Sequence, residues 1–343
     1  MKQYQNTLYV TTQGAYLAAD GEAVAVRIEK ETRLRVPLHT LGGIVCFGQV
    51  GASPFLLGLC GERGVAVSFL TASGRFLARV QGPTSGNVLL RREQYRRADD
   101  EPAAAAIARG VIAAKVANSR AVILRALRDR PQAAGADALR AAVALLAQHL
   151  DGLREGLSLD ALRGLEGAAA RAYFEAFDAL ITQQKEDFFF RGRSRRPPLD
   201  NVNALLSFLY TLLRHDVEAA LEAVGLDPAV GFLHRDRPGR PSLALDLMEE
   251  LRAYLADRLA LSLINLQQIR AGGFSRGESG GVVMDDATRK AVLVAYQKRK
   301  QEEIVHPFLG DKTTVGLLPH LQAALLARHL RGDLDAYPAF FWK

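Results

Sequence analysis

Cysteine is scarce in this sequence, and its scarcity limits the class of protein. Cys46 and Cys60 are the only two, each lies among apolar residues, and neither belongs to a Cys-x-x-Cys pair. Isolated cysteines of this kind predict reduced core residues in a cytosolic protein, not a disulfide framework.

Long apolar runs are missing as well. No stretch reaches about 18 uninterrupted apolar residues, and the N-terminal sequence MKQYQNTLYVTTQG has no apolar segment of the kind found in secretory signals. No period of about 20 to 50 residues recurs, which argues against a solenoid. These absences predict a cytoplasmic protein that does not associate with membranes.

The charge balance is basic. Lys and Arg together number 44 against 37 Asp and Glu, the net charge is +7, and most of the basic residues are arginine. The planar guanidinium binds phosphate through paired hydrogen bonds, so the composition favours a nucleic-acid partner. A genome rich in GC also enriches arginine and alanine together, and this alternative explains the composition without any partner.

The first part of the chain has the period-two pattern of strands. Val24, Val26 and Ile28 alternate with Ala25 and Arg27. Residues 1–82 are therefore predicted to form a small, mostly antiparallel β domain. The predicted strands cover residues 8–10, 15–18, 23–29, 34–36, 44–47, 65–70 and 75–80, and one helix covers 53–62, with Ser53 as its N-cap and Pro54 in its first turn.

After a Gly/Pro/Ser-rich linker at residues 83–90, the apolar period changes to 3.6. Residues 91–343 are predicted to form a larger all-α domain, which makes the fold class α+β. Two segments interrupt the helical pattern: an arginine-rich loop at 188–198 and a Gly/Ser-rich loop at 271–286. The predicted helices cover residues 87–98, 102–128, 134–152, 158–184, 199–224, 241–271, 287–303 and 315–331.

A histidine and an acidic helix stand close together in residues 231–252. Asp246 is three residues before Glu249 and four before Glu250, so each pair lies on one helix face, where the like charges repel unless a cation lies between them. Together with His234, these carboxylates suit Mg²⁺ or Mn²⁺. The alternatives are a packed or exposed histidine and an ordinary solvated helix face.

Glu166 is a further candidate. It lies in LRGLEGAAARAYF, where small residues let another segment approach closely, and a carboxylate buried in such a setting is costly without a partner. Either it interacts favourably with the helix dipole near an N-terminus, which the composition favours, or it faces a cation.

Several segments, in order, resemble a known family. GLEGAAARAYF, then RRPPLDNVNALLSFLYTLL, then GLDPAVGFLH followed by PSLALDLMEELR, resemble the integrase of the CRISPR adaptation machinery, the larger of its two core spacer-acquisition proteins. The C-terminal DLDAYPAFFWK resembles the form found in type I systems of subtype C. The resemblance spans most of the chain and implies an N-terminal β domain followed by a helical catalytic domain.

The resemblance also implies a catalytic set. It places the metal ligands at Glu166, His234 and Glu249, with Asp246 close to the metal. The family often has aspartate at the position of Glu249, so Glu250 is the nearest competitor for the role of final ligand.

Other residues receive supporting roles. Asn203 and Tyr210 are two helical turns apart and are assigned to a second shell around the ligands or to substrate contact, with ordinary helix packing as the alternative. Basic residues on three segments are predicted to bind DNA phosphates, or else to be solvated: Arg191, Arg193, Arg195, Arg196, Arg235, Arg237, Arg240, Arg289 and Lys290.

The implied activity is metal-assisted DNA integration with endonuclease activity. Members of the family join the 3′-hydroxyls of short foreign duplexes to the CRISPR array by transesterification. The implied partners are double-stranded DNA, a second copy of the chain that pairs through the β domain, and the smaller adaptation protein. Two alternatives stay open: a metal-dependent nuclease on branched DNA, and a basic DNA-binding scaffold without catalysis.

Overall fold

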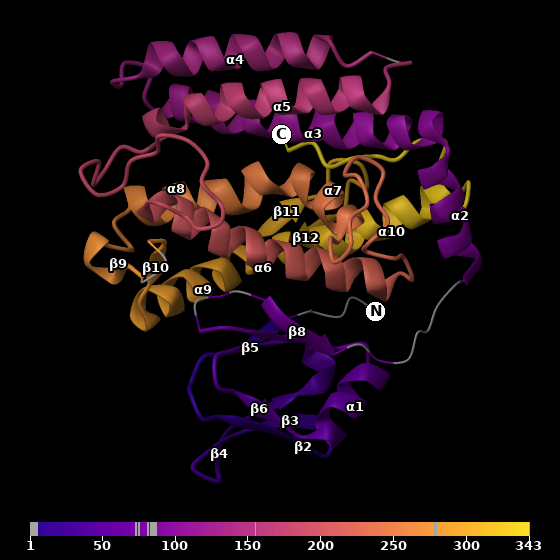
Figure 1. Ribbon diagram of the computed structural model, residues 1–343, viewed down its shortest axis with the longest axis vertical. Coiled ribbons are helices and arrows are strands. Elements are labelled where there is room, and N and C mark those ends of the chain that lie inside the picture. The colour runs from indigo at the N-terminus through magenta and orange to yellow at the C-terminus, as the bar shows by residue number, and fades with distance from the viewer. Residues whose placement is uncertain are drawn as a thin grey trace. The chain divides into compact units, whose positions relative to one another are not determined.

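The chain folds into two compact units. The computed structural model describes residues 6–72, 74, 76–80, 82, 88–154, 156–277 and 280–342. The first unit comprises residues 1–86 and 289–298, and the second comprises 87–288 and 299–343. The first is rich in strands and the second in helices (Figure 1). Of the predicted linker, residues 83–87 lie outside the described residues and 88–90 already belong to helix α2.

The β-rich unit has two four-stranded sheets and helix α1. Ser53 caps α1 as predicted, because its Oγ accepts a hydrogen bond from the backbone N–H of Leu56 at 3.2 Å. Leu17, Ile44 and Val67 are among the buried side chains of its core. The elements are β1 (Asn6–Val10), β2 (Tyr16–Asp20), β3 (Ala23–Ile28), β4 (Glu31–Pro37), β5 (Leu41–Phe47), β6 (Gly51–Ala52), α1 (Pro54–Glu62), β7 (Ala66–Leu70) and β8 (Phe76–Val80).

Strand pairing in this unit is mixed. The sheet orders are β1-β5-β7-β8 and β4-β3-β2-β6. Three pairings are antiparallel (β2–β3, β3–β4 and β7–β8), and three are parallel (β1–β5, β5–β7 and β2–β6). The predicted β-rich fold is confirmed, and its pairings divide equally between antiparallel and parallel. Helix α1 lies in the crossover from β5 to β7, which lets β7 run parallel to β5, and a period of two does not reveal strand direction.

The helical unit is organised around helix α3. This helix packs against α4, α5 and α7, and small buried residues such as Ala104, Ala108 and Ala114 let the neighbours approach it closely (Figure 1). The helices are α2 (Val88–Asp99), α3 (Glu101–Asp129), α4 (Ala136–Asp151), α5 (Leu159–Glu175), α6 (Asn201–Ala223), α7 (Ser242–Leu251), α8 (Arg258–Asn265), α9 (Asp286–Gln301, shared between the units) and α10 (Leu318–Leu330).

Two predicted helices are shorter than expected. The segment 158–184 leaves the α-helix at Glu175 and continues as the 3₁₀ turn Phe177–Leu180. The segment 241–271 divides into α7, the π-helical turn Arg252–Asp257 and α8. A π turn inserts an extra residue without changing the apolar composition, so the sequence pattern runs through it unbroken.

The second unit is not entirely helical. It contains the antiparallel pairs β9 (Phe274–Arg276) with β10 (Val282–Met284) and β11 (Glu303–Val305) with β12 (Lys312–Thr314). The predicted helical domain is confirmed, but these two hairpins were not predicted, because three-residue strands are too short to give a period-two signal. None of the helices in the described part of the chain is long and apolar enough to span a membrane.

Candidate active site

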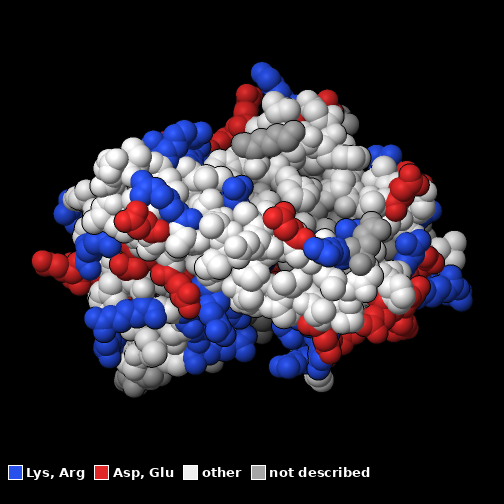
Figure 2. All heavy atoms as spheres, turned by 90° about the horizontal axis from the view of Figure 1, so that it is seen from above, with Lys and Arg blue, Asp and Glu red and all other residues white. Residues whose placement is uncertain are grey.

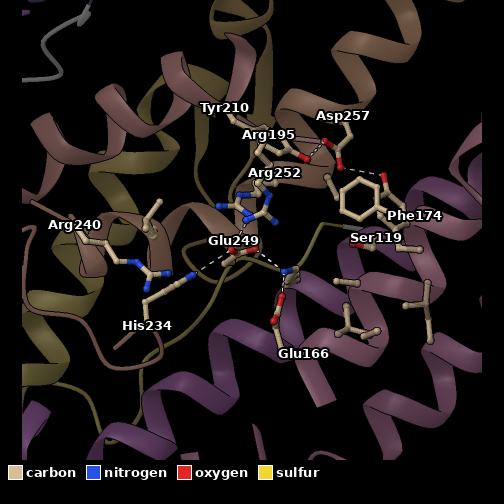
Figure 3. A pocket seen from close by; sticks show the side chains of 18 residues that line it. Ser119, Glu166, Phe174, Arg195, Tyr210, His234, Arg240, Glu249, Arg252 and Asp257 are labelled. Carbon is tan, nitrogen blue, oxygen red and sulfur yellow. Dashed lines mark hydrogen bonds and ion pairs between the residues drawn. The ribbon is translucent and has the colours of Figure 1, made fainter. Parts of the chain in front are cut away.

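A cavity of about 200 Å³ opens in the helical unit among α3, α5, α6 and α7. Glu166 on α5, His234 in the loop before α7 and Glu249 on α7 point toward one another in it (Figure 3). The structure thus brings together the three side chains that the resemblance implies as ligands, although the first is far from the other two in sequence.

Lys115 on α3 already places a cation between two of these side chains. Its Nζ lies 2.7 Å from Glu249 Oε2 and also contacts Glu166 Oε1. Glu249 Oε2 is buried and accepts no hydrogen bond of good geometry from any described residue, so its contact with Lys115 is an ion pair. The point between the two carboxylates is therefore a cation position.

Glu249 is held in its charged form. Its side chain is only 3% exposed, and burial by itself would raise its pKa. The charges of Arg252 and Lys115, and that of His234 when its imidazole is protonated, outweigh burial and lower the pKa of Glu249 to about 2. Arg252 contributes directly, with its NH1 nitrogen 2.8 Å from Glu249 Oε1. A carboxylate ionised at neutral pH is the form that binds a cation.

Asp246 orients the loop that carries His234. Its carboxylate accepts hydrogen bonds from the backbone N–H groups of Phe232, Leu233 and His234 at 2.6, 2.9 and 2.9 Å. Its Oδ1 also lies 2.6 Å from His234 Nδ1. A Cβ on Gly231 would lie 2.7 Å from Asp246 Oδ2, so this close approach requires glycine. Asp246 is thus a positioning residue with both of its oxygens already engaged.

The donor set fits a divalent cation such as Mg²⁺ or Mn²⁺. An imidazole that donates from Nδ1 to Asp246 keeps the lone pair of Nε2 free, and His234 Nε2 is 3.9 Å from Glu249 Oε1. Two carboxylates and one imidazole therefore line the same cavity. As they stand, no three His, Cys, Asp or Glu side chains in the described part of the chain converge closely enough to hold an ion, and Lys115 lies where the two carboxylates meet.

Glu250, the competing candidate, faces the C-terminal segment and is absent from the cavity lining. Its carboxylate accepts hydrogen bonds from Tyr337 Oη, the backbone N–H of Phe340 and Gln322 Nε2. Burial raises the pKa of Glu250 to about 7, although these hydrogen bonds oppose the rise. Its oxygens anchor the chain end to α7.

A second polar group borders the same cavity. Asp257, at the end of the π-helical turn, accepts hydrogen bonds from Tyr210 Oη at 2.6 Å and Tyr173 Oη at 3.1 Å. Burial raises the pKa of Asp257 to about 6, against the lowering effect of both tyrosines and of nearby arginines. The structure thus gives Tyr210 a place in the cavity wall, next to the predicted ligands.

Asn203 lies at the start of α6, behind the arginine-rich loop. It is fully buried, and its Oδ1 accepts hydrogen bonds from Arg193 NH1 at 2.6 Å and Ser194 N at 3.0 Å. Arg193 in turn lies over the Tyr210 ring, 5.3 Å from its centroid. Asn203 therefore ties the arginine-rich loop to α6, and it does not line the cavity.

Only two of the basic residues predicted to bind DNA line the cavity. Arg195 and Arg240 line the cavity, whereas Arg235 pairs with Asp160 at 2.9 Å on the surface and Arg289 is buried. On the face seen in Figure 2, basic side chains are interspersed with acidic ones. The remaining predicted residues do not line the cavity: Arg191, Arg193, Arg196, Arg237 and Lys290.

The cavity is also lined by residues that were not among the sequence candidates, including Lys115, Tyr173, Arg252 and Asp257. Lys115 carries a detectable signal, since it is a lone charge within the apolar run GVIAAKVAN. Arg252 and Asp257 are, with Arg258, the charged residues of the otherwise mostly apolar stretch 251–261. A charge on a buried helix face is costly without a partner, so Lys115, Arg252 and Asp257 each indicate a polar site inside the fold.

The fold and the site together define a class of protein. A β-rich unit precedes a helical unit in which carboxylates, an oriented histidine and arginines share one cavity, a combination suited to phosphate chemistry. Residues 8–298 match the family described as CRISPR associated protein Cas1, and the chain belongs to this family.

Individual relatives agree with this assignment. The chain is 56% identical, over 343 residues and the full length of both, to CRISPR-associated endonuclease Cas1 1 of Chlorobaculum tepidum. Among solved structures it resembles a casposase bound to integration product, with a TM-score of 0.83 at 24% identity, covering 99% of this chain and 95% of that one. It also resembles a chain of a Cas6-RT-Cas1–Cas2 complex, with a TM-score of 0.81 at 24% identity, covering 100% of this chain and 36% of that one.

Proposed function

We propose that the protein is a divalent-metal-dependent DNA integrase and endonuclease of CRISPR adaptation, which joins the 3′-hydroxyl ends of short foreign duplexes to the CRISPR array. The observation that carries this proposal is the cation position between Glu166 and Glu249, beside the oriented imidazole of His234. The similarity to an endonuclease over the full length, and to a casposase bound to integration product, supports it.

Glu166, Glu249 and His234 Nε2 are the residues that would hold Mg²⁺ or Mn²⁺. A divalent ion bound there supplies charge stabilisation to the phosphate at which strands are exchanged. The Lys115 ammonium has to leave the two carboxylates before they can serve as ligands. Oxygen and imidazole donors suit both ions, and Mn²⁺ accepts imidazole more readily.

The rest of the cavity prepares the substrate. Arg195 and Arg240 line it and would bind phosphate oxygens, which aligns the scissile phosphate for in-line attack by a 3′-hydroxyl. Asp246 keeps the imidazole of His234 in one tautomer and one orientation. Arg252, paired with Glu249, keeps that carboxylate charged.

The proposed partners are double-stranded DNA, a second copy of this chain that pairs through the β-rich unit, and the smaller adaptation protein. One similar solved chain belongs to a complex that contains Cas2, which supports the last of these. The exposed edges of four-stranded sheets are compatible with pairing between copies. We also assign the protein to a type I, subtype C-like system in the cytoplasm, from its resemblance.

The test is a strand-joining assay with the purified protein, the smaller adaptation protein and a plasmid that carries an array. Fluorescent duplexes end in a 3′-hydroxyl or a 3′-deoxy group, and reactions contain Mn²⁺ or EDTA. We expect joining only with the hydroxyl and the metal, and none from Glu166→Gln or His234→Ala, both of which should still bind duplex. Glu175→Gln is the matched control, because Glu175 is an exposed acid on the same helix.

Each alternative predicts a different result. If the protein cleaves branched DNA but joins no strands, and cleaves equally well when the duplexes end in a 3′-deoxy group, it is a nuclease that uses water as its nucleophile. Activity of the assembled complex that is insensitive to EDTA, or that is unchanged in Glu166→Gln, would contradict the proposed site and favour a scaffold.

A further inference from the structure

The loop of residues 224–241, between α6 and α7, leaves the core at His234. Phe232 and Leu233 before it are buried, whereas residues 235–239 after it are exposed. The imidazole therefore lies where the packing of the loop ends. Its position depends on the hydrogen bonds that the loop makes to neighbouring helices.

Helix α7 holds one side of this loop. Besides the contacts of Asp246, Ser242 Oγ donates a hydrogen bond to the carbonyl oxygen of the residue that follows His234, at 3.3 Å. Glu249 lies on the same helix, so these contacts fix the imidazole relative to one of the two carboxylates. They do not fix it relative to Glu166, which lies on α5.

Helix α5 holds the other side through Arg163. The Nε of this residue donates a hydrogen bond to the carbonyl oxygen of Leu233 at 2.7 Å. That carbonyl belongs to the same peptide group as the His234 N–H, which donates to Asp246 at 2.9 Å. A trans peptide group is rigid and directs its C=O and N–H to opposite sides. The two helices therefore hold one rigid plane, directly before the imidazole, from opposite sides.

The bond from Arg163 is stronger than the other link between α5 and this loop. That other link, between Arg235 and Asp160, joins side chains that are 65% and 69% exposed, and exposed ion pairs contribute little to stability. The Arg163 side chain is only 27% exposed, and it donates from a charged group to the carbonyl of the buried Leu233. Asp160 also accepts a hydrogen bond from Arg163 NH1 at 2.7 Å, which orients the guanidinium.

Arg163 lies three residues before Glu166, on the same face of α5. One helical turn and one hydrogen bond therefore connect the helix of this carboxylate to the peptide of His234. Lys115 also connects α5 to α7, but its ammonium has to leave before a metal binds. The bond from Arg163 involves no donor atom of the metal site and persists when the ammonium leaves.

We propose that Arg163 is a positioning residue for the metal site. By holding the Leu233–His234 peptide to α5, it sets the separation between His234 Nε2 and the carboxylate of Glu166, and with it the affinity for the divalent cation. Arg163 does not line the cavity, so it acts through the loop and is not itself a ligand. The inference rests on the proposed function, because that function supplies the metal.

Two substitutions separate the hydrogen bond of Arg163 from its charge. Arg163→Met removes the charge and every N–H donor. Arg163→Gln also removes the charge, but it keeps an N–H donor at the position of Nε, because the amide nitrogen of glutamine is likewise bonded to Cδ. A role that needs the charge, such as attraction of a DNA phosphate, is lost in both variants, whereas the contact with the loop is lost only with methionine. Arg171→Gln is the matched control, because Arg171 is an exposed arginine on the same helix and outside the cavity.

The first measurement is a Mn²⁺ titration without DNA, followed by electron paramagnetic resonance. Arg163→Met should weaken Mn²⁺ binding about three- to tenfold, less than the loss of a direct partner of the ligating histidine, because Asp246 remains. Arg163→Gln and Arg171→Gln should bind as the wild type does. In a His234→Ala background the methionine substitution should have no further effect, because Arg163 acts through the imidazole. Wild-type affinity in Arg163→Met, equal losses with methionine and glutamine, or an undiminished loss in the His234→Ala background would overturn the proposal.

The second measurement needs no metal. In protein labelled with ¹³C at histidine, the Cε1–H resonance of His234 is assigned from its loss in His234→Ala. Arg163→Met should shift and broaden this resonance and leave those of the other six histidines in place, and Arg163→Gln should restore it. An unchanged His234 resonance in Arg163→Met, or equal changes at all the histidines, would contradict a local positioning role.

Failure of this inference and failure of the proposed function give different results. If the wild-type protein binds no Mn²⁺ while Arg163→Met displaces the His234 resonance, the placement of the imidazole by Arg163 stands and the metal-dependent function falls. If the wild type binds Mn²⁺ and joins strands while Arg163→Met matches it in both, the proposed function stands and the positioning role falls.

Discussion

Replacing Lys115 with methionine removes the cation that the chain itself supplies between Glu166 and Glu249. Methionine keeps the length and apolar stem of lysine, so the loss is mainly that of the ammonium group. The Lys115 side chain is only 13% exposed, which means that water cannot readily replace it beside Glu249. Two opposite effects are expected: a less stable metal-free protein and a tighter metal site.

The magnitudes follow from the contacts. Loss of one partner of a buried ion pair costs about 3–5 kcal/mol when the other charge is left unpaired. Glu249 keeps Arg252 at 2.8 Å, so we expect a smaller loss of unfolding free energy, about 1–3 kcal/mol. In the variant the metal does not have to displace an ammonium group. Each 1.4 kcal/mol that this displacement costs in the wild type corresponds to a factor of ten in metal affinity. Mn²⁺ should therefore bind roughly tenfold more tightly.

The assay is a Mn²⁺ titration followed by electron paramagnetic resonance, with thermal unfolding in EDTA on the same samples. Lys185→Met is the control, because Lys185 also pairs with a carboxylate, Asp178 at 3.1 Å, but on the exposed surface outside the cavity. Unchanged or weaker Mn²⁺ binding by Lys115→Met would refute the idea that lysine and metal compete for one position.

Three further predictions test separate parts of the account. Asp246→Asn should weaken Mn²⁺ binding about 10- to 100-fold, because His234 loses the carboxylate that orients it; equal affinity in isothermal titration would count against this. Tyr337→Phe should lower the unfolding free energy by about 1–3 kcal/mol and leave Mn²⁺ affinity unchanged, since Glu250 binds the chain end; a large change in affinity would place Glu250 among the ligands. The raised pKa of Asp257, about 6, means that its contribution to stability is fully present below its ordinary pKa near 3.8 and is lost as the pH rises through 6. The melting temperature of wild type relative to Asp257→Asn should thus fall between pH 4 and 7, and a constant difference would disprove the shift.

The predictable parts of the fold are those with a strong local signal. Ser53 and Pro54 begin α1 where expected, because a cap and a first-turn proline act within a few residues. The long apolar period of α3 likewise predicts a helix close to its observed bounds. The direction of β7 and the three-residue strands in the second unit depend on tertiary connections, which local residue patterns do not encode.

The residues of the candidate site also differ in how well the sequence predicts their positions. The spacing of Asp246 and Glu249 indicates a shared helix face, and the resemblance adds Glu166, which no local pattern links to α7. The orientation of Glu250 toward the chain end was not predictable, because adjacent helical residues differ in direction by about 100° and only the packing decides which faces the cavity. The place of Asp257 depends on the π turn, which leaves no trace in the apolar period.

The most direct test of the central claim is a crystal structure of the protein soaked with Mn²⁺, with the ion located by its anomalous scattering. The account predicts one ion within about 2.0–2.3 Å of oxygens from Glu166 and Glu249 and of His234 Nε2, with the Lys115 ammonium displaced. An ion bound elsewhere, or Lys115 still paired with both carboxylates at saturating Mn²⁺, would contradict it.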